Sequence, residues 1–173
     1  MKNICLLLIV LTLSSFACAQ KNDDTLFVAH WHVENLFDTM DDPKTSDEEF
    51  LPSGAKEWNG ERLDNKMYNL SRVIRSMNND NGPDLFGVCE VEHQTLLDTM
   101  ITKYLSDKFY KTAYLESLDG RGIDNGIIYD SQKFSLLKVK GHRVDVGGEY
   151  DTRYILEGIF LFEKTDTIDF FVN

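Results

Sequence analysis

The sequence predicts an α/β fold in which a mixed sheet carries helices on its outer face. Short apolar runs rich in β-branched and aromatic residues alternate with segments of helical periodicity in the first part of the chain. Strand-like runs separated by turn residues dominate the last part. The 173 residues are about one domain's worth of chain and are enough to bury a core.

Residues 1–19 have the features of a secretory signal peptide. Lys2 is followed by an apolar run, and Ala17-Cys18-Ala19 gives the small-x-small pattern of a cleavage site. The run is too short for a comfortable transmembrane helix. We therefore expect an exported protein, periplasmic or extracellular, whose mature chain has no transmembrane segment. Lipid modification of Cys18 is the alternative, which the bulky Phe16 disfavours.

Residues 20–173 are then predicted to form the folded domain. They contain one cysteine, Cys89, so no internal disulfide can form in the exported chain. The formal net charge of −11 gives an acidic surface, and such a surface repels nucleic acid phosphates. A phosphate substrate would therefore need local cations at its site, from the protein or from a metal ion.

The first half of the domain is predicted to hold a strand, a loop and a helix. The strand covers residues 25–31, "TLFVAHW", which contain no breaker. A long acidic loop with two prolines and a glycine follows over residues 38–54. From Trp58 to Met77 the period becomes helical. The apolar residues at three- and four-residue spacing are Leu63, Met67, Leu70, Ile74 and Met77.

The second half is predicted to consist mainly of strands. Residues 85–91, "LFGVCEV", form a nearly continuous apolar run, as expected for a strand that is buried on both faces. Residues 93–105 fit a second helix. The further strand-like segments are residues 110–117, 127–130, 134–146, 153–163 and 167–173.

Acidic side chains lie at the end of the buried run over residues 85–91 and just beyond it. The run leads directly into Glu90, and Glu92 and His93 lie beside it. Ionised carboxylates at the exit of a buried strand are costly unless they are paired or bound to a metal ion. A hard divalent cation suits oxygen ligands of this kind. A solvated strand end is the alternative, and this segment alone does not decide between the two.

The segment "DGRGIDNG", residues 119–126, combines glycines with charged residues. Glycines let a backbone approach a ligand closely, and the guanidinium of Arg121 has the geometry to recognise phosphate oxygens. A strand rather than a helix follows, so the segment is not a dinucleotide-binding fingerprint. A tight hairpin whose charges are only solvated is the alternative.

Five segments occur in a fixed order: "WHVENLFD", "FGVCEVEH", "DGRGIDNGIIYD", "TRYILEG" and "DFFVN". This series resembles the endonuclease/exonuclease/phosphatase superfamily, and in particular its secreted bacterial branch. The resemblance extends from Phe27 to Asn173. It implies a DNase I-like α/β sandwich of mixed sheets with outer helices. It also implies a monomer that hydrolyses phosphoesters with Mg²⁺ or Mn²⁺; nucleic acid, nucleotide and small phosphoester substrates all stay open.

The resemblance implies a role for particular residues. Glu90 matches the main metal-binding carboxylate, and Glu34 matches a second acidic residue near the metal ion. Arg121 and Asp124 match the loop beside the scissile phosphate. Arg153 in "TRYIL" matches an arginine that is common at the site.

Two residues depart from the pattern of the family. His32 stands where an asparagine that helps to hold the metal ion or the phosphate is usual. Imidazole can still bind a divalent ion, but its preference shifts toward softer metals such as Mn²⁺ or Zn²⁺. Tyr154 stands where an aspartate is common, which would remove a polar contact.

The family also has catalytic residues beyond the strand that matches "DFFVN", and the sequence ends before them. We therefore interpret the chain as the N-terminal half of a truncated, exported, metal-dependent phosphoesterase that is inactive alone. A non-catalytic cation-binding module on the same fold is the alternative, and a fragment without a function of its own is a third interpretation. We expect the apolar strands at residues 127–130, 154–162 and 169–173 to lack a facing layer.

Overall fold

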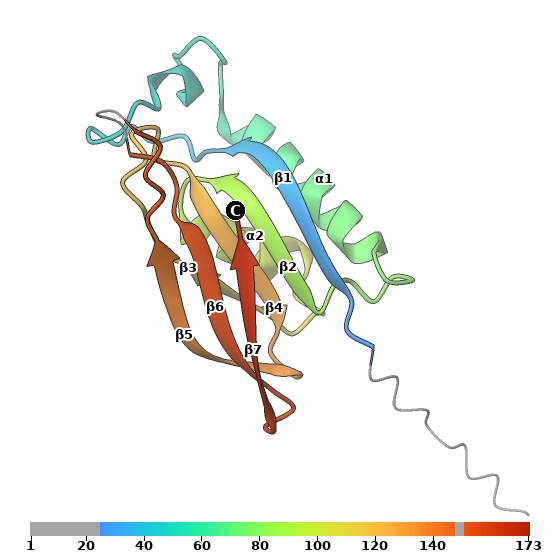
Figure 1. Ribbon diagram of the computed structural model, residues 1–173. Helices are drawn as coiled ribbons and strands as arrows, with labels where there is room; N and C mark the ends of the chain where they lie inside the picture. Colours follow the sequence, from blue (N-terminus) through green and yellow to red (C-terminus); the bar gives the residue numbers. More distant parts are fainter. Residues whose placement is uncertain (1–24, 148–150) are drawn as a thin grey trace, which may run out of the picture.

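Two sheets lie face to face in the computed structural model, and α1 and α2 cover the outer side of one sheet (Figure 1). The structure describes residues 25–147 and 151–173. The predicted signal peptide, residues 1–19, lies outside the described residues. Within the described ranges, no helix has both the length and the apolar character needed to cross a membrane. The predicted α/β class with a mixed sheet and outer helices is confirmed.

The larger sheet contains both parallel and antiparallel neighbours. β1 is parallel to β2, whereas β4 is antiparallel to both β2 and β3. A parallel pair needs a crossover connection, and the chain between β1 and β2 contains α1. Every residue of β2 is buried, as predicted, because helices cover one face and the second sheet covers the other. In sheet order the strands are β1 (Val28–Leu36), β2 (Leu85–Val91), β4 (Asp124–Asp130) and β3 (Tyr110–Tyr114).

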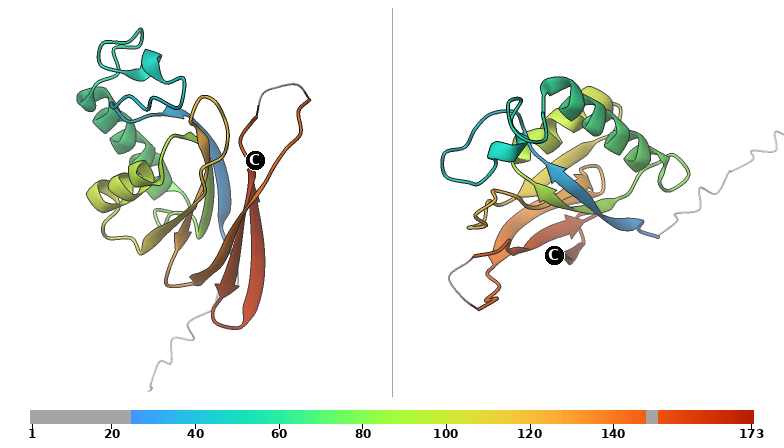
Figure 2. Two further views of the ribbon diagram at one scale, coloured as in Figure 1. Left: turned by 90° about the vertical axis from the view of Figure 1, so that its left-hand side faces the viewer. Right: turned by 90° about the horizontal axis from the view of Figure 1, so that it is seen from above.

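The helices pack their apolar faces on this sheet (Figure 2). They are α1 (Gly60–Ser76) and α2 (Gln94–Tyr104), preceded by a short 3-10 helix, η1 (Glu48–Phe50). The side chain of Asn59 accepts a hydrogen bond from the backbone N–H of Arg62, so the capped α1 begins two residues after the predicted start at Trp58. The buried residues of α1 contact β2 and α2 in one core. From α1 they are Met67, Leu70 and Ile74.

The smaller sheet packs on the other face of the larger one. It consists of β5 (Phe134–His142), β6 (Ile155–Phe162) and β7 (Asp166–Val172), all antiparallel. β5 is shorter than the predicted segment 134–146. On β7, Phe171 is 54% exposed while its neighbour Val172 is buried, because successive side chains of a strand point to opposite faces of the sheet.

The expectation that the late strands lack a facing layer is wrong. Residues from β4 lie opposite residues of β6 and β7 in a second buried core, so each segment serves as the other's cover. The two sheets approach closely at Gly87 of β2, where an added Cβ would lie 2.8 Å from Cγ2 of Val172. Local sequence patterns show which face of a strand is apolar but not which other strand covers it. The shared core consists of Leu85, Ala113, Ile127, Tyr129, Phe134, Leu156, Phe160 and Val172.

The first strand differs from its prediction in both bounds. It was predicted at residues 25–31, but β1 runs from Val28 to Leu36. The strand continues past Trp31 because β2 supplies a parallel partner up to Leu36, which pairs with Val91. His32 and Glu34 therefore lie inside β1 rather than in a loop after it, next to the end of β2.

Candidate active site

β1 and β2 are irregular at the same level, and the site begins there. Their register runs evenly as far as His32 opposite Cys89, and it resumes at Leu36 opposite Val91. Three residues of β1 therefore correspond to one residue of β2, Glu90. Bulges of this kind change the direction of side chains and are common beside active sites.

The bulge has an unusual backbone. Glu34 (φ 56), Asn35 (φ 59) and Glu90 (φ 66) are all left-handed, a conformation that costs a glutamate more than an asparagine. The bulge also changes which side chains face the helices. Val88 and Val91 both lie in the core under the helices, although strict alternation would pair residue 90 with residue 88. Glu90 is thereby released from that core.

The carboxylate of Glu90 is the point where the predicted site residues meet. Its Oε1 lies 3.1 Å from Nη1 of Arg153 and 3.2 Å from Nε2 of His32. Its Oε2 accepts a hydrogen bond of 3.2 Å from the backbone N–H of Asn35. Burial raises the pKa of this carboxyl, but the hydrogen bond from Arg153 and the neighbouring His32 outweigh burial and hold the pKa below its usual range. Glu90 is therefore anionic at neutral pH.

A second arginine reaches the same carboxylate from the 119–126 segment. Nη1 of Arg121 lies 4.0 Å from Oε1 of Glu90. The guanidinium is fixed by the buried Asp119, whose Oδ1 and Oδ2 lie 3.0 and 2.9 Å from Nε and Nη2 of Arg121. This paired contact leaves the Nη1 side directed toward Glu90. The orientation of Arg121 is thus set before any ligand binds.

Asp124 is buried beside the segment that carries Arg121. It is 4% exposed, and its two carboxylate oxygens each lie 3.1 Å from the backbone nitrogen of Ser117. The hydroxyl of Tyr114 lies 3.3 Å from Oδ2. Burial raises the pKa of this carboxyl. These contacts make Asp124 an anchor for the segment that carries Arg121, and a direct contact with phosphate stays a prediction.

A lysine that the sequence did not single out stabilises the bulge. Nζ of Lys66, on α1, donates a hydrogen bond to the backbone carbonyl of Glu34 and lies 3.4 Å from that of Asn35. Burial lowers the pKa of Lys66, and the charges of Glu34 and Glu90 oppose that shift. The side chain of Glu34 thus lies within the electrostatic reach of Lys66. No spacing rule could have identified Lys66, because its partners lie more than thirty residues away.

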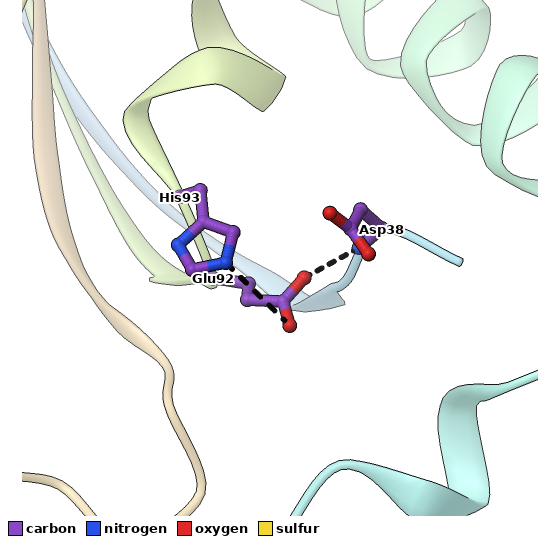
Figure 3. A group of neighbouring side chains, drawn as sticks. All are labelled: Asp38, Glu92 and His93. Atoms are coloured by element: carbon purple, nitrogen blue, oxygen red, sulfur yellow. Dashed lines mark hydrogen bonds and ion pairs between the residues drawn. The ribbon is translucent and has the colours of Figure 1, made fainter. Parts of the chain in front are cut away.

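A second group of side chains lies at the ends of β1 and β2 (Figure 3). One ligand atom from each of Asp38, Glu92 and His93 lies within 4.8 Å of the others. Oε2 of Glu92 accepts a hydrogen bond of 2.6 Å from the backbone N–H of Asp38. Burial raises the pKa of Glu92 to about 7, and the charge of Asp38 adds to this shift.

The predicted site residues therefore divide into groups. His32, Glu90, Arg121 and Arg153 come together around one carboxylate. Glu34 lies at the same bulge, and Asp124 supports the Arg121 segment. Their roles toward a metal ion or a phosphate stay predictions. Sequence reasoning noted Glu92 and His93 only as neighbours of Glu90, and the cue to their partner Asp38 was its place just beyond the parallel strand β1.

A comparison with known families agrees with this fold. The model of the family described as "Endonuclease/Exonuclease/phosphatase family" matches residues 27–173. None of the curated proteins compared with the chain matches it.

Three solved structures are similar to the chain. An endonuclease/exonuclease/phosphatase family protein from Bacteroides thetaiotaomicron has a TM-score of 0.55 at 16% identity, over 84% of this chain and 48% of that one. A mannosyl-6-phosphatase from the same organism has a TM-score of 0.53 at 16% identity, over 85% and 50%. ANGEL2, a 2',3'-cyclic phosphatase, has a TM-score of 0.51 at 15% identity, over 83% and 39%. The similarity concerns the fold, and this chain spans half or less of the length of each structure.

Proposed function

Because the chain belongs to the endonuclease/exonuclease/phosphatase family, we propose that it carries the metal-binding and phosphate-binding part of a phosphoester hydrolase. Similar structures include two phosphatases, so a hydrolase of the phosphatase or nuclease type is the class to which the fold points. The observation that carries the proposal is the convergence of His32, Arg121 and Arg153 on the carboxylate of Glu90.

The donor atoms at the bulge fit a divalent cation. Glu90 is ionised although it is largely buried, and Nε2 of the half-exposed His32 lies 3.2 Å from its Oε1. Carboxylate oxygens suit Mg²⁺, whereas an imidazole shifts the preference toward Mn²⁺. Glu90, Glu34 and His32 would hold the ion. When bound, the ion would polarise a phosphoryl oxygen and stabilise the charge that develops on it.

The arginines supply the rest of the phosphate site. Arg121 and Arg153 would donate hydrogen bonds to non-bridging oxygens of the phosphate, and such donors act most strongly where charge develops in the transition state. Asp119 already fixes the direction of Arg121. These cations, with Lys66, provide local positive potential in a chain whose formal net charge is −11.

The substrate class follows from charge and from the similar structures. A small phosphoester or a nucleotide fits an acidic protein better than long duplex DNA does, and two similar structures are phosphatases by name. The 173-residue chain would act as a monomer after export. We expect it to be inactive alone, because it spans half or less of the structures it matches.

The alternative is a cation-binding module without turnover on the same fold. His32 favours it, because an imidazole has replaced the asparagine that is usual in the family and lies in contact with Glu90. The two proposals agree on the metal ion and differ on phosphate. Only a hydrolase needs Arg121 and Arg153 to bind phosphate beside the ion.

Calorimetric titrations with Mn²⁺, and then with inorganic phosphate in excess Mn²⁺, test the proposal. Glu90→Gln should weaken Mn²⁺ binding at this centre at least tenfold, and Arg153→Met should weaken phosphate binding at least tenfold while Mn²⁺ still binds. Glu163→Gln is the matched control, because Glu163 is exposed in the turn between β6 and β7. Mn²⁺ binding without phosphate binding would favour the module. Mn²⁺ affinity that Glu90→Gln leaves unchanged would contradict both.

A further inference from the structure

The end of the parallel strand pair β1 and β2 holds side chains that the Glu90 centre does not use. Asp38 lies just beyond β1, while Glu92 and His93 lie just beyond β2 (Figure 3). Their ligand atoms lie within 4.8 Å of one another. In the part of the chain that the structure describes, this group shares no hydrogen bond or ion pair with Glu90.

This group has an excess of negative charge that the described residues do not neutralise. Glu92 is 2% exposed and the nearby Asp47 is 1% exposed. Among the described residues, no lysine or arginine forms an ion pair with Asp38, Asp47 or Glu92, and the basic group paired with Glu92 is His93, at 4.0 Å. Buried charges in proteins are normally paired or bound to a metal ion.

Asp47 gives an independent indication of a ligand. Its Oδ2 accepts a hydrogen bond of 3.1 Å from the backbone N–H of Asp42, but its Oδ1 is buried and has no partner. Burial and, to a smaller extent, the charge of Asp47 raise the pKa of Glu92, so the two carboxylates lie near enough for their charges to interact. A buried oxygen without a partner is rare in proteins and calls for an explanation. A cation beside Asp47 provides one.

His93 is oriented as a metal ligand would be. Its Nδ1 lies 3.2 Å from Oε1 of Glu116, which leaves Nε2 to face Oε1 of Glu92 at 4.0 Å. A carboxylate that is hydrogen-bonded to one ring nitrogen of a ligand histidine fixes the tautomer. It also raises the basicity of the other ring nitrogen, which binds the metal ion. Metal–ligand bonds of about 2.0–2.2 Å allow two ligand atoms to lie up to about 4 Å apart.

We propose that Asp38, Glu92 and His93, beside the buried Asp47, form a second cation site, distinct from the Glu90 centre, that binds Zn²⁺ or Mn²⁺. The mixture of one imidazole with carboxylates favours these ions over Ca²⁺ and Mg²⁺. The ion joins the ends of β1 and β2, and its charge attracts the acidic loop that contains Asp47. That loop donates a hydrogen bond of 2.9 Å from the backbone N–H of Ser46 to the carbonyl of Gly120, beside Arg121. The second ion therefore stabilises the segment that positions Arg121.

The test counts ions in the full chain after metal removal with EDTA. Calorimetric titration with Zn²⁺ should reveal a bound ion that the Glu90→Gln variant retains. His93→Gln or Asp47→Asn should weaken the binding of this ion at least tenfold. His142→Gln is the matched control, because His142 pairs with Glu157 on the second sheet. Glu116→Gln should weaken the same ion about 10- to 100-fold through His93.

Two further readouts make the proposal falsifiable. Co²⁺ bound to the Glu90→Gln variant should give a visible absorption spectrum, and His93→Gln should change it. Saturating Zn²⁺ should raise the melting temperature of Glu90→Gln but not that of folded Asp47→Asn. Asp47→Asn keeps the shape of the side chain, so it still tests the site if the His93 variant fails to fold. Zn²⁺ binding that both variants leave unchanged would overturn the proposal, even if the Glu90 centre binds its own ion.

Discussion

Glu90 and Glu92 stand two residues apart at the end of one strand, yet their surroundings are opposite. Glu90 lies among Arg121, Arg153 and His32, which keep it anionic. Glu92 lies near other carboxylates, and burial raises its pKa to about 7. Two carboxylates of one strand end can thus have different charges at neutral pH. Proximity in sequence does not decide a carboxylate's role; the bulge at residue 90 and the charges around each side chain do.

The largest expected effect is on the pH dependence of stability. The ordinary pKa of Glu92 is 4.5, and in the folded protein it is about 7. Between these values the folded state keeps a proton that the unfolded state releases, so Glu92 makes the metal-free protein less stable as pH rises. At 1.36 kcal/mol for each pKa unit, the loss amounts to about 3 kcal/mol.

Urea denaturation of the wild type and of Glu92→Gln in EDTA, from pH 4.5 to pH 8, measures this effect. The difference between the two free energies of unfolding should change in favour of the variant as pH rises. The contribution of Glu90 to stability should have the opposite pH dependence. The pKa of Glu90 is lowered in the folded protein, so Glu90 adds stability at pH values above its ordinary pKa of 4.5, and this stability is lost as pH falls. A difference that does not change with pH would mean that Glu92 titrates normally.

The next effect compares the two isosteric substitutions at pH 8 without metal. Glu90→Gln leaves the guanidinium of Arg153 without its partner at 3.1 Å, and we expect it to cost about 2 kcal/mol. Glu92→Gln removes a charge that its neighbours oppose and keeps an acceptor for the N–H of Asp38, so it should stabilise by about 1 kcal/mol. Urea denaturation midpoints with an unchanged slope would measure both. Equal losses in the free energy of unfolding for the two variants would contradict the proposed difference between the surroundings of Glu90 and Glu92.

A smaller effect should separate positioning from binding at Arg121. Asp119→Asn weakens the paired contact that fixes the guanidinium, so phosphate affinity in excess Mn²⁺ should fall about three- to tenfold. Mn²⁺ affinity should not change. Asp169→Asn is the control, since Asp169 is exposed on β7. If Asp119→Asn weakens Mn²⁺ binding as much as phosphate binding, Asp119 supports the whole centre rather than Arg121.

Local pattern predicted the elements better than their partners. The period of α1, the continuous apolar run of β2 and the alternation of β7 were visible in the sequence because each reflects the faces of one element. The extent of β1 was not, because its last residues are strand only through their pairing with β2. The packing of β4 against β6 and β7 was missed for the same reason.

The candidate site shows the same division. Glu90 and Arg121 stood out because a carboxylate after a buried strand and an arginine among glycines are unusual locally. Lys66 and Asp47 did not, because a lysine on a helix and an aspartate in an acidic loop are ordinary. The importance of Lys66 depends on its hydrogen bond to the backbone of Glu34, far away in the chain, and that of Asp47 on its charge near Glu92. Such contacts become visible only in three dimensions.

The smallest expected effect concerns the strained backbone that separates the two carboxylates' environments. Glu34 has a φ of 56, which glycine adopts without the steric cost that a side chain brings. Glu34→Gly should therefore stabilise the protein by about 0.5 kcal/mol, a relief of strain partly offset by the greater freedom of glycine in the unfolded chain. Mn²⁺ affinity at the Glu90 centre should fall at the same time, because the variant lacks a proposed ligand. Glu34→Ala is the matched control, since it removes the same carboxylate but keeps the strain. If Glu34→Gly is no more stable than Glu34→Ala, the left-handed turn is not strained, and the bulge is set by Lys66 and the register of β1 alone.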